Sequence, residues 1–397
     1  MIVPLKHVAF INREQLPESC HEALSFRYVD IGSVSGDGEM TIPSDSITIA
    51  DAPSRARRLA PVGAIVVSTV RTYLRAVARV PVCPELLVFS TGFAVLEARE
   101  GIHPGFLYYL CRSDVVIDEV VARSSGVGYP AINASDMGRI AVDVPPLDQQ
   151  WRIADFLDEQ IGRFDRMVNL RRRLVELLTE KAEHAIRQHI AESLEVVGSD
   201  ADAHGIPLKR ILTKVKRPPM PEGETITAFR DGQVTARSRR RTEGFTEAWT
   251  ESATFQGINV GDVVIHGLDG FAGAIGTSES EGVCSPVYHV CVPADGDDPY
   301  FIGRMLRILA LSDYLSLFGG SARQRAVDFR NWSSFARTQV PLVEKSEQKK
   351  IGALLKQIQI LEDAVTRYTS LIGERKQALI TSAVTGQFDV TAARGVA

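Results

Sequence analysis

Cysteine and histidine are the residues of this sequence that could bind a metal. His289 lies between Cys284 and Cys291, but no second pair with the spacing of a zinc site completes the set. The chain has five cysteines, an odd number at scattered positions: Cys20, Cys83, Cys111, Cys284 and Cys291. This pattern favours reduced thiols in the cytoplasm over a disulfide framework. We therefore expect buried cysteines and no metal.

Motifs that bind nucleotides or activate a nucleophile give no match. The sequence has no G-x-x-x-x-G-K-[ST], and the glycines of residues 32–38 have the wrong spacing for a dinucleotide loop. Residues 297–300, DDPY, are similar to the Asp-Pro-Pro-Tyr tetrapeptide of amino-methyltransferases but lack its second proline. The serines of residues 124–136 stand in no G-x-S-x-G context. We expect a binding protein rather than an enzyme, with no cofactor of its own.

Basic residues occur in local clusters although the net charge is −4. A protein that binds nucleic acid often has a basic total. Here the cationic side chains gather in residues 55–58 (RARR), 71–79 (RTYLRAVAR), 214–217 (KVKR) and 237–241 (RSRRR). Phosphate contact would depend on these segments, each of which could also be a solvated surface. No apolar run approaches the roughly 20 residues that span a bilayer, so we expect no membrane partner.

The elements that would position such residues occur twice. VPLKHV at residues 3–8 returns as IPLKRI at 206–211, and GAIVVS at 63–68 returns as GDVVIH at 261–266. Residues 88–110 align with 283–305, and residues 177–186 align with 371–380. The proline-containing joints VPPLDQQWRIADFL (144–157) and VPLVEKSEQKKIGALL (340–355) form the fifth pair. Five matched blocks in one order predict a duplicated architecture.

Each copy begins with a part that mixes strands and short helices. Short β-branched runs predict strands at residues 64–70, 86–96 and 140–144. Residues 104–123 and 299–315 predict short helices, each with a proline near its first turn. The predicted fold class is α+β. Its expected domains are residues 1–146 and 206–342, with long helices at 147–192 and 343–386, a linker at 193–205 and a C-terminal tail at 387–397.

The two long helices carry apolar stripes with alternating steps of three and four residues, the pattern of a coiled-coil seam. The predicted seam residues are Leu157, Ile161, Phe164, Val168, Val175, Leu178, Ile358, Leu361, Val365, Tyr368 and Ile372. A single stripe of this kind would also suit an ordinary core helix. Because two stripes lie at equivalent places in a duplicated chain, we expect the helices to pair with each other as an antiparallel coiled coil. About 35 residues would span roughly 50 Å.

The joints and the chain ending carry a resemblance to a known family. The order of globular part, VPPLDQQWRIADFLD, helix, globular part, VPLVEKSEQKKIGALL, helix and ERKQALITSAVTGQ (374–387) resembles the specificity (S) subunits of type I restriction–modification systems. The resemblance covers essentially the whole chain and is looser in the globular parts. The second joint departs from the Pro-Leu-Asp-Gln-Gln spelling, and the first helix ends differently from the second. These departures weaken the expectation of symmetric partner docking.

The resemblance implies a non-catalytic subunit that reads double-stranded DNA. Each globular domain would read one half of a bipartite, asymmetric target, and the helix pair would set the unspecified spacer. Two methyltransferase subunits would dock on the chain and supply S-adenosylmethionine-dependent adenine methylation. A motor–nuclease subunit, with its own ATP and Mg²⁺, could join for cleavage. This chain itself would hold no cofactor.

Loops that follow equivalent strands supply the candidate DNA contacts, together with two arginine-rich segments. The candidates are Arg71, Tyr73, Arg75, Ser125, Tyr129, Arg237, Arg239, Arg240, Arg241, His266, Asp269, Phe271, Arg323, Gln324 and Arg325. Base edges specify a sequence, whereas phosphate contacts position the protein. Two alternatives stay open: a structural adaptor whose domains bind proteins, and a self-contained methyltransferase fragment.

Overall fold

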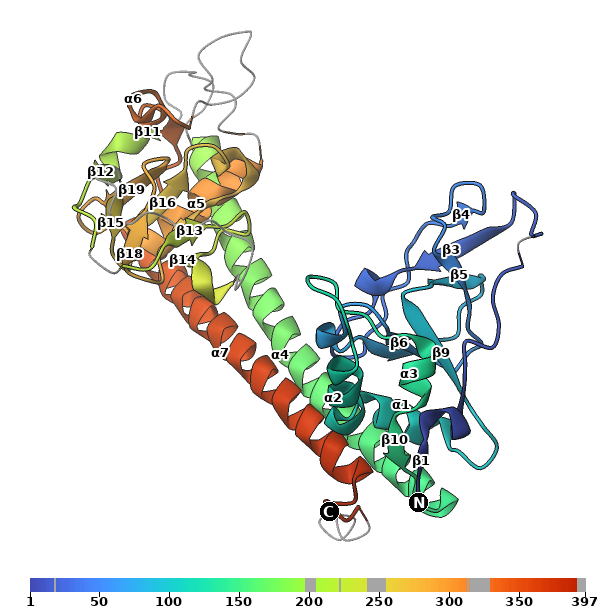
Figure 1. Ribbon diagram of the computed structural model, residues 1–397. Helices are drawn as coiled ribbons and strands as arrows, with labels where there is room; N and C mark the ends of the chain where they lie inside the picture. Colours follow the sequence, from blue (N-terminus) through green and yellow to red (C-terminus); the bar gives the residue numbers. More distant parts are fainter. Residues whose placement is uncertain are drawn as a thin grey trace. The chain divides into compact units, whose positions relative to one another are not determined.

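The computed structural model describes residues 1–17, 19–196, 205–220, 223–240, 255–312, 314 and 329–390. It divides into two compact units, residues 1–170 with 366–397, and residues 171–365. Each unit therefore combines one globular part with a portion of each long helix (Figure 1). The fold class is α+β with two long helices that pack together, as the sequence predicts.

The first globular part and the helix that follows it contain these elements in chain order: β1 (Ile2–Pro4), η1 (Leu5–His7), β2 (Ala9–Ile11), β3 (Ser25–Val29), η2 (Ile31–Ser33), β4 (Ile47–Thr48), β5 (Ala56–Leu59), β6 (Ile65–Ser68), η3 (Thr72–Leu74), β7 (Val77–Arg79), β8 (Leu87–Ser90), β9 (Phe93–Ala98), α1 (Pro104–Arg112), α2 (Asp114–Ala122), α3 (Ala134–Gly138), β10 (Ala141–Asp143) and α4 (Leu147–Val196).

The second globular part and its helix contain β11 (Ile206–Pro207), η4 (Leu208–Arg210), β12 (Leu212–Val215), β13 (Ile226–Ala228), β14 (Val234–Ala236), η5 (Arg237–Arg239), β15 (Gln256–Ile258), β16 (Val263–His266), η6 (Gly270–Ala272), β17 (Ile275–Thr277), β18 (Gly282–Cys284), β19 (Tyr288–Pro293), α5 (Pro299–Leu311), α6 (Trp332–Phe335), β20 (Gln339–Val340) and α7 (Lys345–Val384).

A four-stranded antiparallel sheet is repeated in the two units. Its strand order is β2-β9-β6-β7 in the first unit and β12-β19-β16-β17 in the second. The register is repeated too, because Ser68 pairs with Phe93 in one sheet and His266 pairs with Tyr288 in the other. The internal duplication seen in the sequence therefore extends to individual residue pairs.

The side chains of β6, a central strand of this sheet, alternate between two core layers on opposite faces. Ile65 and Val67 face the cluster formed with α1, α2 and the long helices, whereas Val66 faces the cluster shared with β3 and β8. In the second unit Val263 and Ile265 face the helices. Successive side chains of a strand point to opposite faces, so one strand can serve two cores. The helix-facing layer fixes the sheet, and the loops at its end, on the helix pair.

The helix pair is antiparallel within each unit. In the first unit Leu157 and Ile161 of α4 share a core cluster with Ile380 and Val384 of α7. In the second unit Ile186 and Ile190 of α4 share a core cluster with residues near the start of α7, including Ile351. The N-terminal part of α4 thus packs on the C-terminal part of α7, and the C-terminal part of α4 packs on the N-terminal part of α7.

The predicted seam residues occupy different degrees of burial. Leu157, Ile161, Val168, Ile358 and Ile372 are buried, and Phe164, Val175, Leu178, Val365 and Tyr368 are half-buried. The expectation for Leu361 is wrong, because its side chain is 39% exposed. The inward register takes a four-residue step from Ile358 to the half-buried Glu362, not a three-residue step to Leu361. An apolar stripe in the sequence did not reveal that the inward position is acidic.

The helix expected over residues 104–123 is two helices. Ser113 is buried in an extended conformation (φ −64°, ψ 150°) and separates α1 from α2. Its hydroxyl donates a hydrogen bond to the carbonyl of Leu110 at 2.7 Å. Because serine can bond to the backbone locally, it competes with a continuous helix. The break starts α2 at Asp114, which is used below.

Candidate nucleic-acid interface

The loop of residues 69–76 follows β6 and is held by hydrogen bonds to two neighbouring segments. The hydroxyl of Thr69 donates to the carbonyl of Gly92 at 2.9 Å. The backbone N–H of Arg71 donates to the carbonyl of Pro130 at 2.8 Å, and Thr72 Oγ1 lies 2.9 Å from Ser124 Oγ. Loop 69–76 and the loop of residues 124–132 therefore form one surface.

Two arginines in loop 69–76 adopt left-handed backbone conformations. Arg71 has φ 52° and Arg75 has φ 56°. Such conformations cost about 1–3 kcal/mol each in a residue other than glycine and persist when the surroundings hold them in place. They concentrate at binding and active sites. The strain in this loop is the first sign that its shape serves a function.

Exposed aromatic and cationic side chains cover the joined loops. Tyr73 is 55% exposed and Tyr129 is 64% exposed. The guanidinium of Arg71 lies over the Tyr129 ring at 4.6 Å from its centroid. Ser125 and Ala131 exchange backbone hydrogen bonds at 2.9 and 3.0 Å, which closes loop 124–132. The structure thus brings together Arg71, Tyr73, Ser125 and Tyr129, which the sequence placed in two separate segments.

Arg75 shares this loop, and its side chain is paired with carboxylates of the same unit. Its guanidinium is ion-paired with Asp114, and its Nη1 lies 3.9 Å from Asp118 Oδ1. Both carboxylates belong to α2. The sequence expectation that Arg75 contacts DNA therefore competes with an intramolecular role that the structure gives it.

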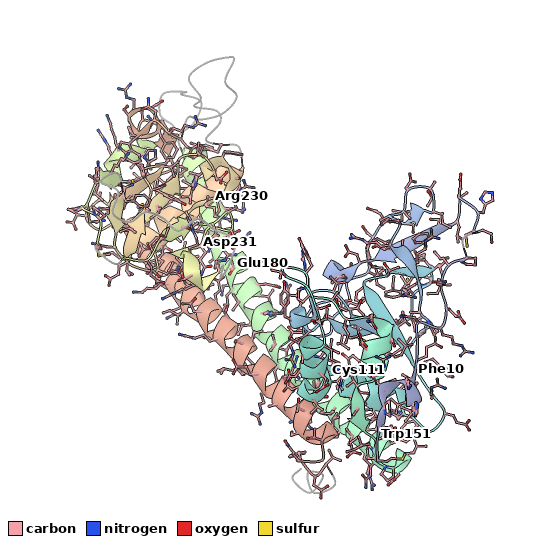
Figure 2. All side chains as sticks on the ribbon, viewed as in Figure 1. Phe10, Cys111, Trp151, Glu180, Arg230 and Asp231 are labelled. Carbon is pink, nitrogen blue, oxygen red and sulfur yellow. The ribbon has the colours of Figure 1, made fainter. Side chains whose placement is uncertain are left out.

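The equivalent loop of the second unit, residues 267–274, has another construction. His266 Nδ1 accepts hydrogen bonds from the backbone N–H groups of Leu268 and Asp269, at 3.1 and 2.9 Å. Burial lowers the pKa of His266 and thereby favours the neutral ring, whose Nδ1 accepts the two bonds that support the turn. Asp269 is paired with Arg230 at 3.1 Å (Arg230 is labelled in Figure 2), and Phe271 is 59% exposed. Phe271 is the residue of this loop most accessible to a ligand.

The arginines near β14 make contacts within the second unit. Arg237 Nε donates to Thr227 Oγ1 at 3.2 Å, and Arg239 lies 3.8 Å from Asp363. Arg240 is paired with Asp231 at 2.6 Å and lies over the Phe229 ring. Phosphate contact by these residues stays a prediction. Arg241, Arg323, Gln324 and Arg325 lie outside the described residues.

A basic pocket that the sequence patterns did not indicate lies beside β2. It has a volume of about 460 Å³, and its lining includes Lys6, Phe10, Arg13, Arg99 and Arg139. The guanidiniums of Arg99 and Arg13 lie 3.9 and 5.0 Å from the centroid of the Phe10 ring. These residues come from three separate segments of the chain, so local charge runs could not reveal the pocket. It belongs to the end of the sheet opposite loop 69–76, since Phe10 pairs with Glu97 and Ser68 pairs with Phe93.

The cysteines considered for metal binding are separated by the sheet. Cys284 and Cys291 belong to different core clusters of the second unit. Burial raises the pKa of the Cys284 thiol to about 12 and also raises that of Cys291. The His289 ring lies between the carbonyl of Phe329, at 2.5 Å from Nε2, and Lys214, at 2.9 Å from Nδ1. Among the described residues, no group of three or more His, Cys, Asp or Glu is arranged to hold a metal ion.

No helix in the described part of the chain combines the length and the apolar composition that crossing a membrane requires.

Known proteins give three findings. Residues 10–174 match the family model described as the type I restriction modification DNA specificity domain. A chain solved in a study of complex assembly and conformational transition of the type I R-M system is similar over 97% of both chains, with 22% identity and a TM-score of 0.59. Comparison with curated proteins gives no match.

Two further solved structures align over most of their length. The HsdS subunit from Thermoanaerobacter tengcongensis has 23% identity over 98% of this chain and 97% of that chain, with a TM-score of 0.45. The type I restriction–modification S subunit from M. genitalium has 14% identity over 96% of this chain and 95% of that chain, with a TM-score of 0.49. Residues 10–174 are thus similar to the type I restriction modification DNA specificity domain, and the whole chain shares its fold with a chain solved in a study of the type I R-M system.

Proposed function

We propose that this chain is the DNA-reading and scaffold subunit of a type I restriction–modification complex. The observation that carries the proposal is the surface formed by Arg71, Tyr73 and Tyr129, in which Arg71 has a left-handed backbone, within the residues that match the specificity-domain model. Arginine contributes both a fixed charge for phosphates and a planar donor group for guanine, and aromatic side chains add stacking and apolar contact. Loop 69–76 would read one half of a bipartite target.

The second half of the target would be read by loop 267–274, with Phe271 at its exposed surface. The two loops follow equivalent strands but differ in sequence and in construction. Two different loops on equivalent sheets would allow the two units to read different half-sites, as an asymmetric target requires. The helix pair would set the spacer between the half-sites and would dock two methyltransferase subunits.

Chemistry would come from those partners. S-adenosylmethionine would bind the methyltransferase subunits, and ATP with Mg²⁺ would bind a motor–nuclease subunit. With a net charge of −4, the chain alone would bind DNA weakly, and the affinity of the complex would fall steeply with salt.

Methylation in the host tests the proposal directly. We expect adenines in one bipartite motif with a fixed gap to lose methylation when the gene is deleted and to regain it on complementation. Long-read sequencing of modified bases measures both. If no motif changes, the DNA-reading proposal fails, and pull-down of protein partners becomes the test of the adaptor alternative.

Substitutions in loop 69–76 test which residues read the first half-site. In the assembled complex, Arg71→Ala and Tyr73→Ala should each reduce affinity for the intact target by about 1–3 kcal/mol and relax the choice of base at one position. Arg139→Ala is the control, since this exposed arginine lines the basic pocket at the opposite end of the sheet. An equal effect of all three variants would argue against loop 69–76 as the reader.

A further inference from the structure

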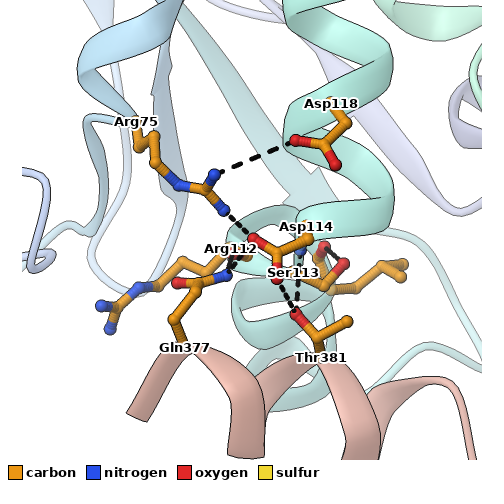
Figure 3. Close-up of polar contacts among 8 residues, drawn as sticks. Arg75, Arg112, Ser113, Asp114, Asp118, Gln377 and Thr381 are labelled. Atoms are coloured by element: carbon orange, nitrogen blue, oxygen red, sulfur yellow. Dashed lines mark hydrogen bonds and ion pairs between the residues drawn. The ribbon is translucent and has the colours of Figure 1, made fainter. Parts of the chain in front are cut away.

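Arg75 connects loop 69–76 to α2 through two carboxylates. It is the residue that ends η3, and its guanidinium is ion-paired with Asp114, the first residue of α2 (Figure 3). Asp118, one turn further along α2, lies 3.9 Å from Arg75 and is far more exposed than Asp114. Asp114 is therefore the main partner.

Asp114 is at the same time bound by α7. Thr381 Oγ1 donates to Asp114 Oδ2 at 3.0 Å and accepts the backbone N–H of Asp114 at 3.0 Å. Gln377 Nε2 donates to Asp114 Oδ1 at 3.0 Å and to the carbonyl of Arg112 at 2.8 Å. One carboxylate thus joins loop 69–76 to a helix more than 260 residues away in sequence. We call Arg75, Asp114, Gln377 and Thr381 the Asp114 network.

The break between α1 and α2 makes this network possible. Because Ser113 stops α1, the N–H of Asp114 lies in the first turn of a new helix and needs a partner outside it. Thr381 supplies that partner. A carboxylate in the first turn also interacts favourably with the helix dipole. The local sequence therefore prepares Asp114 to receive donors from both sides.

The strained backbone explains what the network does. Arg71 and Arg75 flank η3 with left-handed conformations, and each is fixed by a contact outside the loop. Arg71 is fixed by Pro130, and Arg75 is fixed by Asp114. Without the second contact the loop could relax to ordinary backbone conformations. Tyr73, which stands between the two arginines, would then lose its fixed orientation.

From this geometry we infer that Asp114 is the positioning residue of the first DNA-reading loop, and that Gln377 and Thr381 of α7 hold Asp114 in place. The inference rests on the proposed function. Arg75 acts through Asp114 on the presentation of Arg71 and Tyr73, and it does not contact DNA itself. The closing segment of the chain thereby takes part in reading a half-site whose loop lies in the first hundred residues.

The second unit has a different contact at the equivalent place. Glu183 of α4 aligns with Gln377, and it is paired with Arg304 at 3.0 Å and lies 3.6 Å from Arg307, both on α5. Within the described residues, loop 267–274 is instead closed by its own turn, with a left-handed glycine at Gly273. Loss of the Asp114 network should therefore affect the first half-site alone.

The test uses the complex with its methyltransferase partners and matched charge controls. Asp114→Asn removes the ion pair with Arg75, and Asp118→Asn removes an equal charge from the same helix. Thr381→Val removes the α7 contact, and Thr385→Val removes a hydroxyl just after α7 that donates to the carbonyl of Thr381. Affinity is measured for the intact target and for targets with either half-site scrambled.

We expect Asp114→Asn and Thr381→Val to reduce discrimination at the first half-site roughly 2- to 30-fold. Discrimination at the second half-site, and both control variants, should be unchanged. The salt dependence of binding should also be unchanged, whereas loss of a phosphate contact would lower its slope by about 1. The effects of Arg75→Ala and Asp114→Asn should not add in the double variant, because both act through one contact.

Additive effects, or a reduced salt slope in Arg75→Ala, would show that Arg75 contacts DNA and would overturn the inference. Equal loss at both half-sites would overturn it too, because that result indicates general destabilisation. If the wild-type complex discriminates neither half-site, the proposed function fails separately. In that case hydrogen exchange of the chain itself tests whether the Asp114 network holds the loop. Faster exchange at residues 71–76 in Asp114→Asn but not in Asp118→Asn supports the network. Equal exchange in the two variants contradicts it.

Discussion

In the second unit Glu279 lies near two carboxylates of α7, those of Glu362 and Asp363. Glu279 accepts hydrogen bonds from Gln233, at 3.2 Å, and from Gln359 of α7. Burial is the main cause that raises the pKa of Glu279 above its ordinary value, and the charges of Asp363 and Glu362 raise it further. Burial also raises the pKa of Glu362. Ionisation of Glu279 and Glu362 therefore costs stability.

The sign of the pH dependence follows from that direction. A carboxyl group with a raised folded-state pKa keeps its proton at a pH where the unfolded chain has lost it. The free energy of unfolding should thus fall as the pH rises from the ordinary value of 4.5 through the raised pKa of Glu279. Glu279→Gln should increase the free energy of unfolding at pH 7, whereas most substitutions reduce stability by about 1 kcal/mol.

Thermal and urea unfolding between pH 4 and 8 measure this effect. Glu281→Gln is the matched control, because Glu281 is exposed and two residues away. The fall of stability with pH should be smaller in Glu279→Gln than in Glu281→Gln. If the two variants have the same profile, the ionised Glu279 carboxylate does not destabilise the fold.

At the scale of elements, each long helix has a buried glutamine in its first turn. Gln150 Oε1 accepts the backbone N–H of His103 at 2.8 Å, and its Nε2 donates to the carbonyl of Pro145 at 2.9 Å. Gln348 makes the same pair of contacts with Asp298 (3.2 Å) and Val343 (2.9 Å). These glutamines join the end of the last strand, the start of the short helix and the start of the long helix. The repeated joint therefore depends on one side chain in each unit.

Removing this side chain should destabilise the joint strongly. Gln150→Ala would leave half-buried backbone groups of His103 and Pro145 without the partner that Gln150 supplies, at a cost of about 1–3 kcal/mol for each group. We expect a loss of about 2–5 kcal/mol by urea unfolding. Gln149→Ala, at the exposed neighbouring position, should change stability by less than about 0.5 kcal/mol. A loss of under 1 kcal/mol in Gln150→Ala would contradict the role of the joint.

Two glycines on α7 should respond in opposite directions to alanine. A Cβ at Gly352 would overlap Asp298 Oδ1, the atom that accepts the N–H of Phe301 at the start of α5. A Cβ at Gly373 would meet nothing within 4 Å. Alanine in a helix interior is favoured over glycine by about 1 kcal/mol. We expect Gly373→Ala to raise the melting temperature and Gly352→Ala to lower it. If both variants raised the melting temperature equally, α5 would have to be able to move away from α7.

At the scale of the whole molecule, each compact unit is built from distant parts of the chain. The first unit takes residues 366–397 from the C-terminal end. Ile380, Ala383 and Val384 are buried in its core cluster, and Lys376 is ion-paired with Asp165 of α4. The last helix turns are thus as much part of the first unit as its own sheet.

Truncation after Val365 should therefore unfold the first unit, although most of that unit lies in residues 1–170. Loss of each buried aliphatic side chain costs about 2–5 kcal/mol, and a domain has about 5–15 kcal/mol in total. We expect hydrogen-exchange protection to fall in α1, α2 and residues 147–170, and to persist in β16 and β19. Truncation after Val390 controls for chain shortening. Retained protection in α1 would show that the first unit does not need α7.

The elements that a sequence could predict are those specified by local patterns and by the repeat. The strands around Val66 and Val264, and the helices begun by Pro104 and Pro299, follow from β-branched runs and fixed proline geometry. The positions that could not be predicted depend on partners distant in sequence. DNA contact by Arg75 stays a prediction from its charge and its loop, whereas its ion pair with Asp114 could be found only in the structure. Leu361 fits the stripe, but packing selected Glu362.

The sequence by itself determined the duplicated α+β architecture, the two long helices and the joints, because repeated blocks and periodic apolar positions act within a few turns or strands. Tertiary structure alone decided which loops share a surface and which charges are used inside the fold. It brought Arg71 over Tyr129, gathered four basic side chains around the basic pocket and placed Thr381 on Asp114. Such contacts depend on the packing of segments hundreds of residues apart, so no local pattern can encode them.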